Sequence, residues 1–270
     1  MRIFSILAFL VTCNLLLGQN ISGIVKNESN GNPVSFVNIG IAGKNFGTVS
    51  DLNGRFNLVI DSIFDNETLL FSSIGYYPFS IKVSDFKSSS DKTVRLKEKK
   101  YDLNEVIIKP KIFKSQTLGV TTKSNMMSAG FRDNFLGYEY GIIMKVKKSA
   151  FIKSVNFNIA SCSYDSIYYR LNIYKVLGKM EFENILREPI YVIMPKQLVS
   201  NEIQIDLKSK NIVVEGDFLV TLEHIKDLGA GSLYFCAGFG DQTYFRKTSQ
   251  GEWGKSVAGI SISVVADVEK

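Results

Sequence analysis

The apolar residues of this chain come in short runs that Gly, Asn, Asp, Ser and Pro interrupt at intervals of roughly ten residues. From residue 21 to residue 108 no stretch keeps a 3.6-residue period, which argues against amphipathic helices in this region. The runs that have the length and composition of β-strands cover residues 21–25, 34–41, 47–50, 55–60, 68–73, 79–83 and 93–96. Short strands at this spacing predict a small β-sandwich.

The second half of the chain shows the same kind of pattern after a polar, aperiodic passage at residues 115–127. Its predicted strands cover residues 137–148, 151–161, 167–176, 189–194, 201–208, 217–225, 231–239 and 257–268. This number of strands indicates a second two-sheet sandwich of the jelly-roll type. Little helix is expected, with a single turn near residues 182–186. The chain is therefore predicted to be all-β with two domains.

One predicted strand, YYRLNIYKV, alternates well enough to assign its two faces. Allowing for slippage at a bulge, the alternation predicts a solvent-facing side with Arg170, Asn172 and Lys175, and a buried side with Leu171, Ile173 and Val176.

The N-terminus has the layout of a secretory signal peptide. Arg2 precedes an apolar stretch over residues 3–17, and Gly18 supplies a small residue before a polar start. We therefore expect residues 1–18 to be removed on secretion; a membrane anchor is the alternative, although the apolar run is short for a spanning helix. Cys13 lies inside that run and is not expected to carry a lipid. No later segment has eighteen uninterrupted apolar residues, so no transmembrane span is predicted after the signal.

A set of residues in the first predicted sandwich resembles a known module. They are Gly23 and Val25, then Pro33, Val34, Val37 and Ile39, then Gly47, Thr48, Asp51, Gly54 and Phe56, then residues 69–72, Gly75 and Tyr76. In this order they resemble the carboxypeptidase regulatory-like domain, a transthyretin-like β-sandwich found in bacterial envelope proteins and at the N-terminus of TonB-dependent receptors. The likeness covers about residues 20–98, and Ser50 replaces the Thr often found before the Asp.

This resemblance implies a fold and a location in the envelope, either periplasmic or associated with the outer membrane, and it implies no catalysis. The segment LNEVIIKP at residues 103–110 also resembles the stretch that follows the module in those receptors. The residues after Pro110 are too few for a receptor barrel of 22 strands. The second half resembles the C-terminal part of uncharacterised envelope proteins that carry the same domain in front.

The predicted organisation is a signal peptide at residues 1–18, a regulatory-like sandwich at 19–98, a basic connector at 99–127 and a second sandwich at 128–270. Most of the formal net charge of +6 lies near the connector, because residues 87–114 hold 9 basic and 4 acidic side chains. A short basic stretch of this kind is typical of a solvated strand edge and linker, and an attraction to anionic lipid or glycan is the alternative. Without a wide basic face or a recognition motif, nucleic acid is not an expected partner.

The stretch GTVSDLNGRF, residues 47–56, is either a calcium loop or a tight turn. With Gly54 at the sixth position of an EF-hand loop, Asp51 and Asn53 fit as ligands, but Val49 and Ile60 fall where the first and last ligands are needed. Two ligands do not make a site. We interpret the stretch as a hairpin in which Asp51 binds backbone N–H groups.

No catalytic constellation is visible in the sequence. His224 is the only histidine, and without HExxH, GxSxG or nucleotide-binding motifs it is interpreted as a strand-end residue on a polar surface. No metal or cofactor is predicted. The carboxylates Glu139, Glu223 and Asp241 could serve a glycosidase only if the fold paired them, which spacing alone does not reveal. The chain is predicted not to be an enzyme.

The binding candidate lies in FGDQTYFRKTSQGEWGK, residues 239–255. Its predicted ligand-binding residues are Asp241, Tyr244, Phe245, Arg246 and Trp253, because flat aromatics beside hydrogen-bonding side chains suit sugar rings or a protein partner. The alternative is that Trp253 fills one end of the sandwich and Arg246 pairs with a local acid.

Two cysteines remain after the signal, and the sequence leaves open whether Cys162 and Cys236 form a disulfide or are separate buried thiols. The functional hypothesis is a non-enzymatic envelope protein that binds, or serves as a scaffold for, a protein or glycan partner. The alternatives are an accessory component of an outer-membrane transport complex and a carbohydrate-active enzyme or peptidase that uses carboxylates of the second domain.

Overall fold

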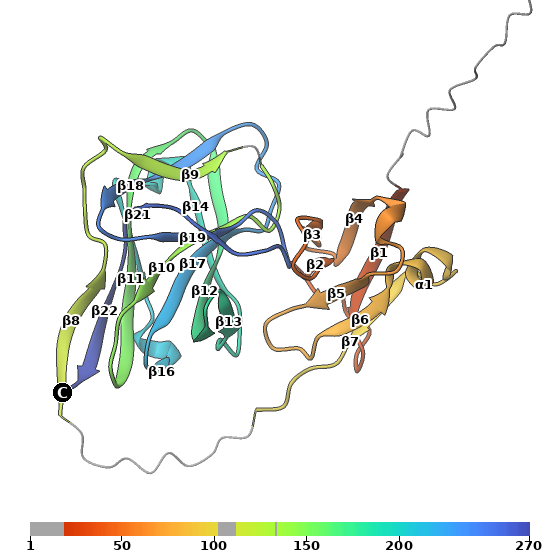
Figure 1. The fold of residues 1–270 in the computed structure, drawn as a ribbon, viewed down its shortest axis with the longest axis horizontal. Coiled ribbons are helices and arrows are strands. Elements are labelled where there is room, and N and C mark those ends of the chain that lie inside the picture. Colours follow the sequence, from red (N-terminus) through yellow and green to blue (C-terminus); the bar gives the residue numbers. More distant parts are fainter. Residues whose placement is uncertain (1–18, 102–111, 133) are drawn as a thin grey trace, which may run out of the picture.

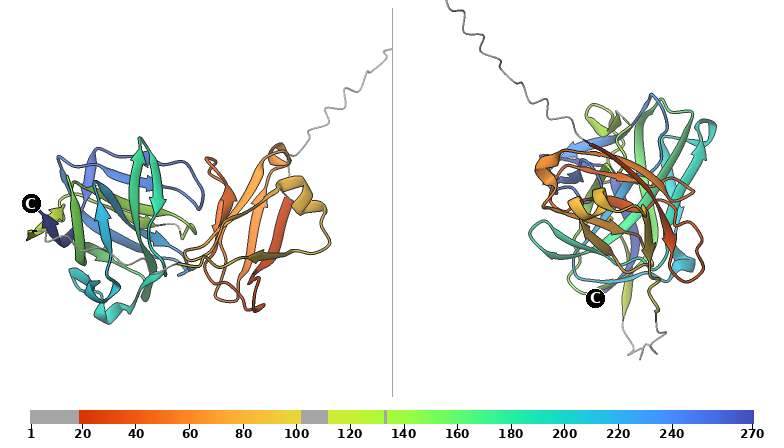
Figure 2. Two further views of the ribbon diagram at one scale, coloured as in Figure 1. Left: turned by 90° about the horizontal axis from the view of Figure 1, so that it is seen from below. Right: turned by 90° about the vertical axis from the view of Figure 1, so that its right-hand side faces the viewer.

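The computed structural model describes residues 19–101, 112–132 and 134–270. The predicted signal peptide, Cys13 and the segment LNEVIIKP lie outside these residues. The described chain folds into two β-sandwiches that lie side by side along the long axis of the molecule (Figure 1, Figure 2). The prediction of an all-β chain with two sandwich domains is therefore confirmed.

The first sandwich consists of a three-stranded sheet in the order β4-β1-β7 and a four-stranded sheet in the order β3-β2-β5-β6. Its elements are β1 (Gln19–Asn27), β2 (Asn38–Ile41), β3 (Gly47–Val49), β4 (Arg55–Ile60), a 3₁₀ turn (Ser62–Phe64), β5 (Thr68–Ser72), β6 (Phe79–Lys82), α1 (Val83–Ser88) and β7 (Thr93–Leu96). Along β4 the apolar side chains Phe56, Leu58 and Ile60 are buried and their neighbours are exposed. This period of two places one face of the sheet on the core.

Two of the predicted strands in this domain end earlier or begin later than expected. The run at residues 34–41 is a strand only from Asn38, because Phe36 has a φ of 53° and this left-handed conformation is incompatible with an extended ladder. The run at residues 79–83 ends at Lys82, where α1 begins and packs Val83 and Phe86 into the core. The sequence did not predict this short helix.

The stretch GTVSDLNGRF forms a tight turn between β3 and β4. The predicted hairpin is wrong, because β3 pairs with β2 in one sheet and β4 pairs with β1 in the other. Oδ1 of Asp51 accepts hydrogen bonds from the backbone N–H groups of Asn53 and Arg55, both at 2.8 Å. Gly54 has a φ of +71°, and a Cβ there would lie 2.4 Å from the carbonyl oxygen of Val25. Asp51 therefore shapes the turn and Gly54 lets it pack closely, which confirms the interpretation as a structural turn.

The second sandwich has a seven-stranded sheet, in the order β13-β12-β17-β10-β19-β20 with β14 also on β12, and an eight-stranded sheet, in the order β21-β18-β11-β22-β8 with β15 and β16 on β11 and β9 on β18. The strands are β8 (Phe113–Gly119), β9 (Ser128–Arg132), β10 (Glu139–Met144), β11 (Ser149–Cys162), β12 (Ser166–Gly178), β13 (Glu181–Asn184), β14 (Ile190–Pro195), β15 (Glu202–Asp206), β16 (Val213–Glu215), β17 (Phe218–His224), β18 (Ser232–Phe239), β19 (Thr243–Arg246), β20 (Gly254–Lys255), β21 (Ala258–Ile260) and β22 (Ile262–Glu269). Two further 3₁₀ turns cover Lys196–Leu198 and Lys208–Lys210.

The structure corrects the predicted boundary of this domain. Residues 113–119, which were assigned to the connector, form β8 at the edge of the eight-stranded sheet, where Leu118 pairs with Val264 of β22. The turn predicted near residues 182–186 is in large part strand β13, which pairs with β12. Both segments are polar and short, so they gave no alternating apolar signal, and their partners in the sheet decide their structure.

Each domain has its own core, and a smaller apolar cluster joins them. The joining cluster contains Phe36 and Val49 of the first domain and Ile225 of the second, with Leu136, Tyr168 and Tyr191 packed around them. Among the described residues, no helix has both the length and the apolar character needed to cross a membrane.

The turn at Asp51 gives a first testable prediction. Replacing Asp51 by Ala removes the acceptor of two backbone N–H groups, and we expect the free energy of unfolding to fall by about 1–2 kcal/mol in urea denaturation. The matched control is Asp241→Ala, an exposed acid, which should change it by less than about 0.5 kcal/mol. Calcium should leave the melting temperature of the wild type unchanged; a calcium-dependent rise that Asp51→Ala abolishes would restore the ion-loop interpretation.

Candidate functional site

A row of four charged side chains crosses the seven-stranded sheet of the second domain. Arg170 of β12 lies opposite Glu223 of β17, Glu223 lies opposite Glu139 of β10, and Glu139 lies opposite Arg246 of β19. All four are buried, with exposed fractions of 2% for Arg170, 0% for both glutamates and 8% for Arg246. The predicted solvent-facing side of β12 is therefore wrong for Arg170 and Asn172, whereas Lys175 is exposed as expected.

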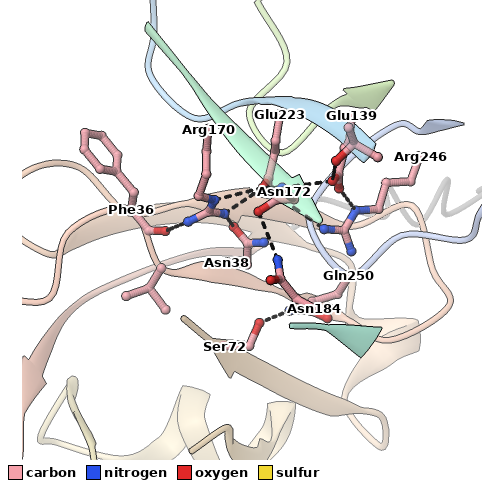
Figure 3. Close-up of polar contacts among 12 residues, drawn as sticks. Phe36, Asn38, Ser72, Glu139, Arg170, Asn172, Asn184, Glu223, Arg246 and Gln250 are labelled. Carbon is pink, nitrogen blue, oxygen red and sulfur yellow. Dashed lines mark hydrogen bonds and ion pairs between the residues drawn. The ribbon is translucent and has the colours of Figure 1, made fainter. Parts of the chain in front are cut away.

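Ion pairs and amide bridges hold the row together (Figure 3). Arg170 donates to Oε2 of Glu223 through Nη2 at 2.7 Å and through Nε at 3.1 Å, and Arg246 donates through Nε to Oε2 of Glu139 at 2.7 Å. Nδ2 of Asn172 bridges the two carboxylates, at 2.9 Å from Glu139 and 2.8 Å from Glu223. We call these four charged residues and Asn172 the charge row.

Further donors satisfy the carboxylate of Glu139. Its Oε1 accepts a hydrogen bond from the hydroxyl of Tyr174 at 2.8 Å and another from the hydroxyl of Thr221. Asn184 of β13 completes the network from the side, because its Nδ2 donates to Oδ1 of Asn172 at 3.1 Å. Buried charges persist when they are paired and hydrogen-bonded in this way, because an unpaired buried charge is very costly.

The two glutamates differ in their electrostatic surroundings. Burial raises the pKa of Glu139 and the nearby Glu223 raises it further, while Arg246 opposes both effects. For Glu223, burial also acts upward, but Arg170 and Arg246 together hold its pKa below the ordinary value. Glu223 is therefore the ionised partner between two guanidinium groups.

Aromatic side chains cover the end of the row at Arg246. The ring of Trp253 lies 5.0 Å from the guanidinium carbon of Arg246 and 5.9 Å, edge-on, from the ring of Tyr174. Phe182 of β13 contacts both Trp253 and Tyr244, at centroid distances of 5.1 and 5.8 Å. This cover keeps water from the charges and strengthens their attraction.

The structure brings together only some of the predicted binding residues. Tyr244, Arg246 and Trp253 share the outer face of the sheet, whereas Phe245 lies on the opposite face, where its ring centroid is 6.1 Å from that of Tyr140. Asp241 is exposed in the turn before β19 and belongs to neither group. The pairing of Arg246 with an acid agrees with the alternative reading, although that acid, Glu139, is distant in the sequence.

Glu139 and Glu223 are the paired carboxylates that an enzyme interpretation needs, but their setting differs from a hydrolytic site. Both are fully buried, and each is bound to an arginine. A general acid or nucleophile has to reach the substrate or a water molecule. In this arrangement the carboxylates have a structural role.

The charge row also fastens the first domain to the second. Nη1 of Arg170 donates to the carbonyl oxygen of Phe36 at 2.8 Å, and its Nη2 donates to Oδ1 of Asn38 at 2.6 Å. The left-handed backbone at Phe36, two residues before β2, accompanies this buried hydrogen bond. One side chain of the second domain thus connects the network to the backbone of the first.

A second contact between the domains is made by the loop at residues 247–251. Nε2 of Gln250 donates to Oγ of Ser72 at 2.7 Å, and the carbonyl of Gln250 accepts from the N–H of Gly43 at 2.9 Å. The carbonyl of Ser249 lies so close to Gly47 that a Cβ on this glycine would be 2.1 Å away. The loop therefore packs directly on the backbone of the first domain.

The remaining predicted residues have different surroundings from those expected. His224 ends β17 as predicted, but it is fully buried beside Tyr169 and Phe131, and the interpretation as a surface residue is wrong. Cys162 and Cys236 are free thiols on the neighbouring strands β11 and β18. Because Cys162 lies opposite Leu233, Cys236 is three residues further along and out of register for a bond.

A groove of ≈ 720 Å³ opens where the two domains meet, and sequence reasoning did not identify it. Its lining residues come from the first domain (Asn45, Gly47 and Thr48) and from the second (Ala129, Gly130, Arg132, Asn134, Phe135, Leu136, Tyr138, Tyr140, Tyr234, Lys247 and Thr248). We call it the junction groove. Its lining comes from both domains, so no single segment of the sequence predicts it.

Comparison with known proteins identifies the first domain. Residues 21–108 match the family model described as CarboxypepD_reg-like domain, so the predicted resemblance is confirmed and this sandwich is such a domain. No curated protein matches the chain closely enough to be called a relative.

Solved structures of infectious bursal disease virus resemble the chain weakly. The structure of the Gx strain is 11% identical, covers 94% of this chain and 76% of its own, and has a TM-score of 0.23. The VP2 subviral particle is 10% identical, covers 87% and 61%, and has a TM-score of 0.20. Scores this low carry no argument about fold or function.

The charge row predicts a large stability effect at one residue. Replacing Arg170 by Met leaves Glu223 buried without its partner and removes the contact with Phe36, so we expect the free energy of unfolding to fall by about 3–5 kcal/mol. Lys145→Met is the matched control, because Lys145 and Asp217 form an ion pair at the surface, and it should cost less than about 1 kcal/mol. Equal losses from both variants, measured in guanidinium chloride, would contradict a stabilising role for the row.

His224 predicts how stability depends on pH. Burial lowers the pKa of its imidazole from 6.5 to about 4, so the unfolded chain binds a proton in a pH range where the folded chain does not. The stabilisation that comes from the neutral imidazole of His224 is present above pH 6.5. We expect the free energy of unfolding to fall by about 2 kcal/mol at pH 5 and by about 3 kcal/mol near pH 4. Unfolding measured between pH 7 and 4 should show this slope, and His224→Phe should flatten it; an unchanged slope in the variant would assign the loss to other groups.

Proposed function

We propose that the protein, whose first sandwich is a CarboxypepD_reg-like domain, is a non-enzymatic binding module of the bacterial cell envelope that engages a protein or glycan partner. In this proposal the two domains act as one rigid body, and the surface at their junction faces the partner. The basic connector and the predicted signal peptide fit a protein that is exported and held near the outer membrane.

The observation that carries this proposal is the contact of Arg170 with the first domain. This guanidinium makes an ion pair inside its own sheet and two hydrogen bonds to the neighbouring domain, and all of these groups are buried. Contacts between domains that move independently are usually polar and solvated. A buried, fully used arginine instead fixes one relative orientation, as a scaffold or a preformed binding surface requires.

The bonds made by the two buried carboxylates support a non-catalytic role for them. Both oxygens of Glu139 accept hydrogen bonds, and Oε2 of Glu223 accepts from Arg170 and Asn172, whereas Oε1 of Glu223 is buried without a hydrogen bond and lies 4.0 Å from Nη2 of Arg246. Among the described residues there is also no group of three or more His, Cys, Asp or Glu side chains that could hold a metal ion. These features favour a binding protein over a hydrolase.

Binding and turnover can be tested together on the full-length secreted chain. We expect saturable binding to isolated peptidoglycan sacculi or to outer-membrane vesicles, and no release of reducing sugar or peptide from either over a long incubation. Cell fractionation should place the protein in the periplasmic or outer-membrane fraction. Turnover that Glu223→Gln abolishes would replace this proposal with the enzyme interpretation, and a cytoplasmic location would contradict the envelope assignment.

A further inference from the structure

The junction groove has one wall made of tyrosines. Tyr138 and Tyr140 stack with their ring centroids 4.9 Å apart and an interplanar angle of 24°, and the hydroxyl of Tyr140 donates to that of Tyr138 at 2.8 Å. Phe131, fully buried below them, meets both rings edge-on. Tyr234 of β18 lines the same groove. These contacts hold the tyrosine pair in one orientation before any ligand arrives.

The phenol of Tyr140 remains protonated in neutral solution. Burial raises the pKa of Tyr140 far above its usual value, and the hydrogen bond with Tyr138 and the nearby Tyr234 raise it further. Because Tyr140 donates its proton to Tyr138, the hydroxyl of Tyr138 has its own proton available for a further acceptor. The wall therefore combines apolar ring surface with hydroxyl groups that both donate and accept.

The lining of the groove also includes polar residues, some of them from the first domain. Asn45 is exposed there with an amide that both donates and accepts, and Lys247 supplies an exposed ammonium group. Oγ1 of Thr248 donates to the carbonyl of Leu136 at 3.3 Å, which ties together two further residues of the lining. Gly47 packs against the carbonyl of Ser249, so this contact between the domains sets how far the lining residues of the first domain lie from the tyrosine wall.

The size and chemistry of the groove select one class of ligand. A volume of ≈ 720 Å³ lies in the range of sites for small molecules, whereas a protein partner buries roughly 800 Å² on each side. A sugar ring presents C–H groups on its face, which pack on the negative face of an aromatic ring, and hydroxyls on its edge, which both donate and accept. The tyrosine rings with their hydroxyls, together with the amide of Asn45 and the ammonium group of Lys247 in the same lining, match that pattern.

We propose that the junction groove binds a saccharide chain a few rings long, stacked on the tyrosine wall and hydrogen-bonded at its edge by Asn45 and Lys247. This inference rests on the proposed binding function and specifies its ligand and its site. The saccharide lies across both domains, so the contact of Arg170 with the first domain preorganises the site without touching the ligand.

The test is titration calorimetry of the full chain with cellohexaose, chitohexaose and maltohexaose as probes. We expect at least one hexasaccharide to bind, Tyr234→Ala to weaken it at least tenfold, and Asn45→Ala to weaken it severalfold. Tyr234→Phe, which keeps the ring and removes the hydroxyl, should retain most of the affinity and guards against a folding defect. The matched control is Phe239→Ala, because Phe239 is 82% exposed at the far end of β18 and does not line the groove.

Binding that survives Tyr234→Ala and Asn45→Ala would overturn the groove as the site, and so would equal losses in the Phe239→Ala control. Absence of binding to all three hexasaccharides would overturn the saccharide assignment. If the protein still binds sacculi or vesicles in either case, the proposed binding function stands and this inference alone fails. If it binds neither the saccharides nor the envelope preparations, both fail.

Discussion

The structure depends on a row of charges buried where a sandwich would ordinarily meet water. The outer face of the seven-stranded sheet carries Arg170, Glu223, Glu139 and Arg246 on four adjacent strands, and formal charges of opposite sign balance across the row. Desolvating such groups is costly, and the cost is offset only when every partner is in place. The position of the first domain and the aromatic cover around Trp253 both follow from this requirement.

This dependence explains why the two domains form one unit. The apolar cluster around Phe36 at the junction is small, and such a cluster alone permits several orientations. Hydrogen bonds from a planar guanidinium are directional, so the bonds from Arg170 to Phe36 and Asn38 select one of them. The groove beside Tyr138 exists because that orientation leaves a gap between the loop of Asn45 and the tyrosine wall.

Sequence reasoning reached the fold because local patterns determine it. The alternation in β4 and the turn chemistry of Asp51 and Gly54 are local, and the structure has both as predicted. Strand β8 was missed because its side chains are almost all exposed and give no apolar signal, and its pairing partner β22 is well over a hundred residues away. The alternation in β12 was correctly recognised, but the polar side was assigned to solvent because nothing nearby in the sequence shows that the first domain and Trp253 cover it.

The candidate site was less accessible to prediction. The hint for the charge row was a charged residue inside each of four apolar strands, such as Glu139 in GYEYGII and Glu223 in LVTLEHI. Single charges of this kind read as surface residues until the register between strands is known. The junction groove left no hint, because its walls come from segments around residues 45, 138 and 234 that meet only in the folded chain.

The place of β8 in the eight-stranded sheet has a consequence for biosynthesis. This strand pairs with β22, and β22 also pairs with β11, so the segment at residues 262–269 lies between two strands that the ribosome makes much earlier. The free edges of β11 and β8 cannot pair until residues 262–269 have left the ribosome. The second sandwich therefore has open strand edges during synthesis, a period in which binding by a chaperone would protect it from aggregation.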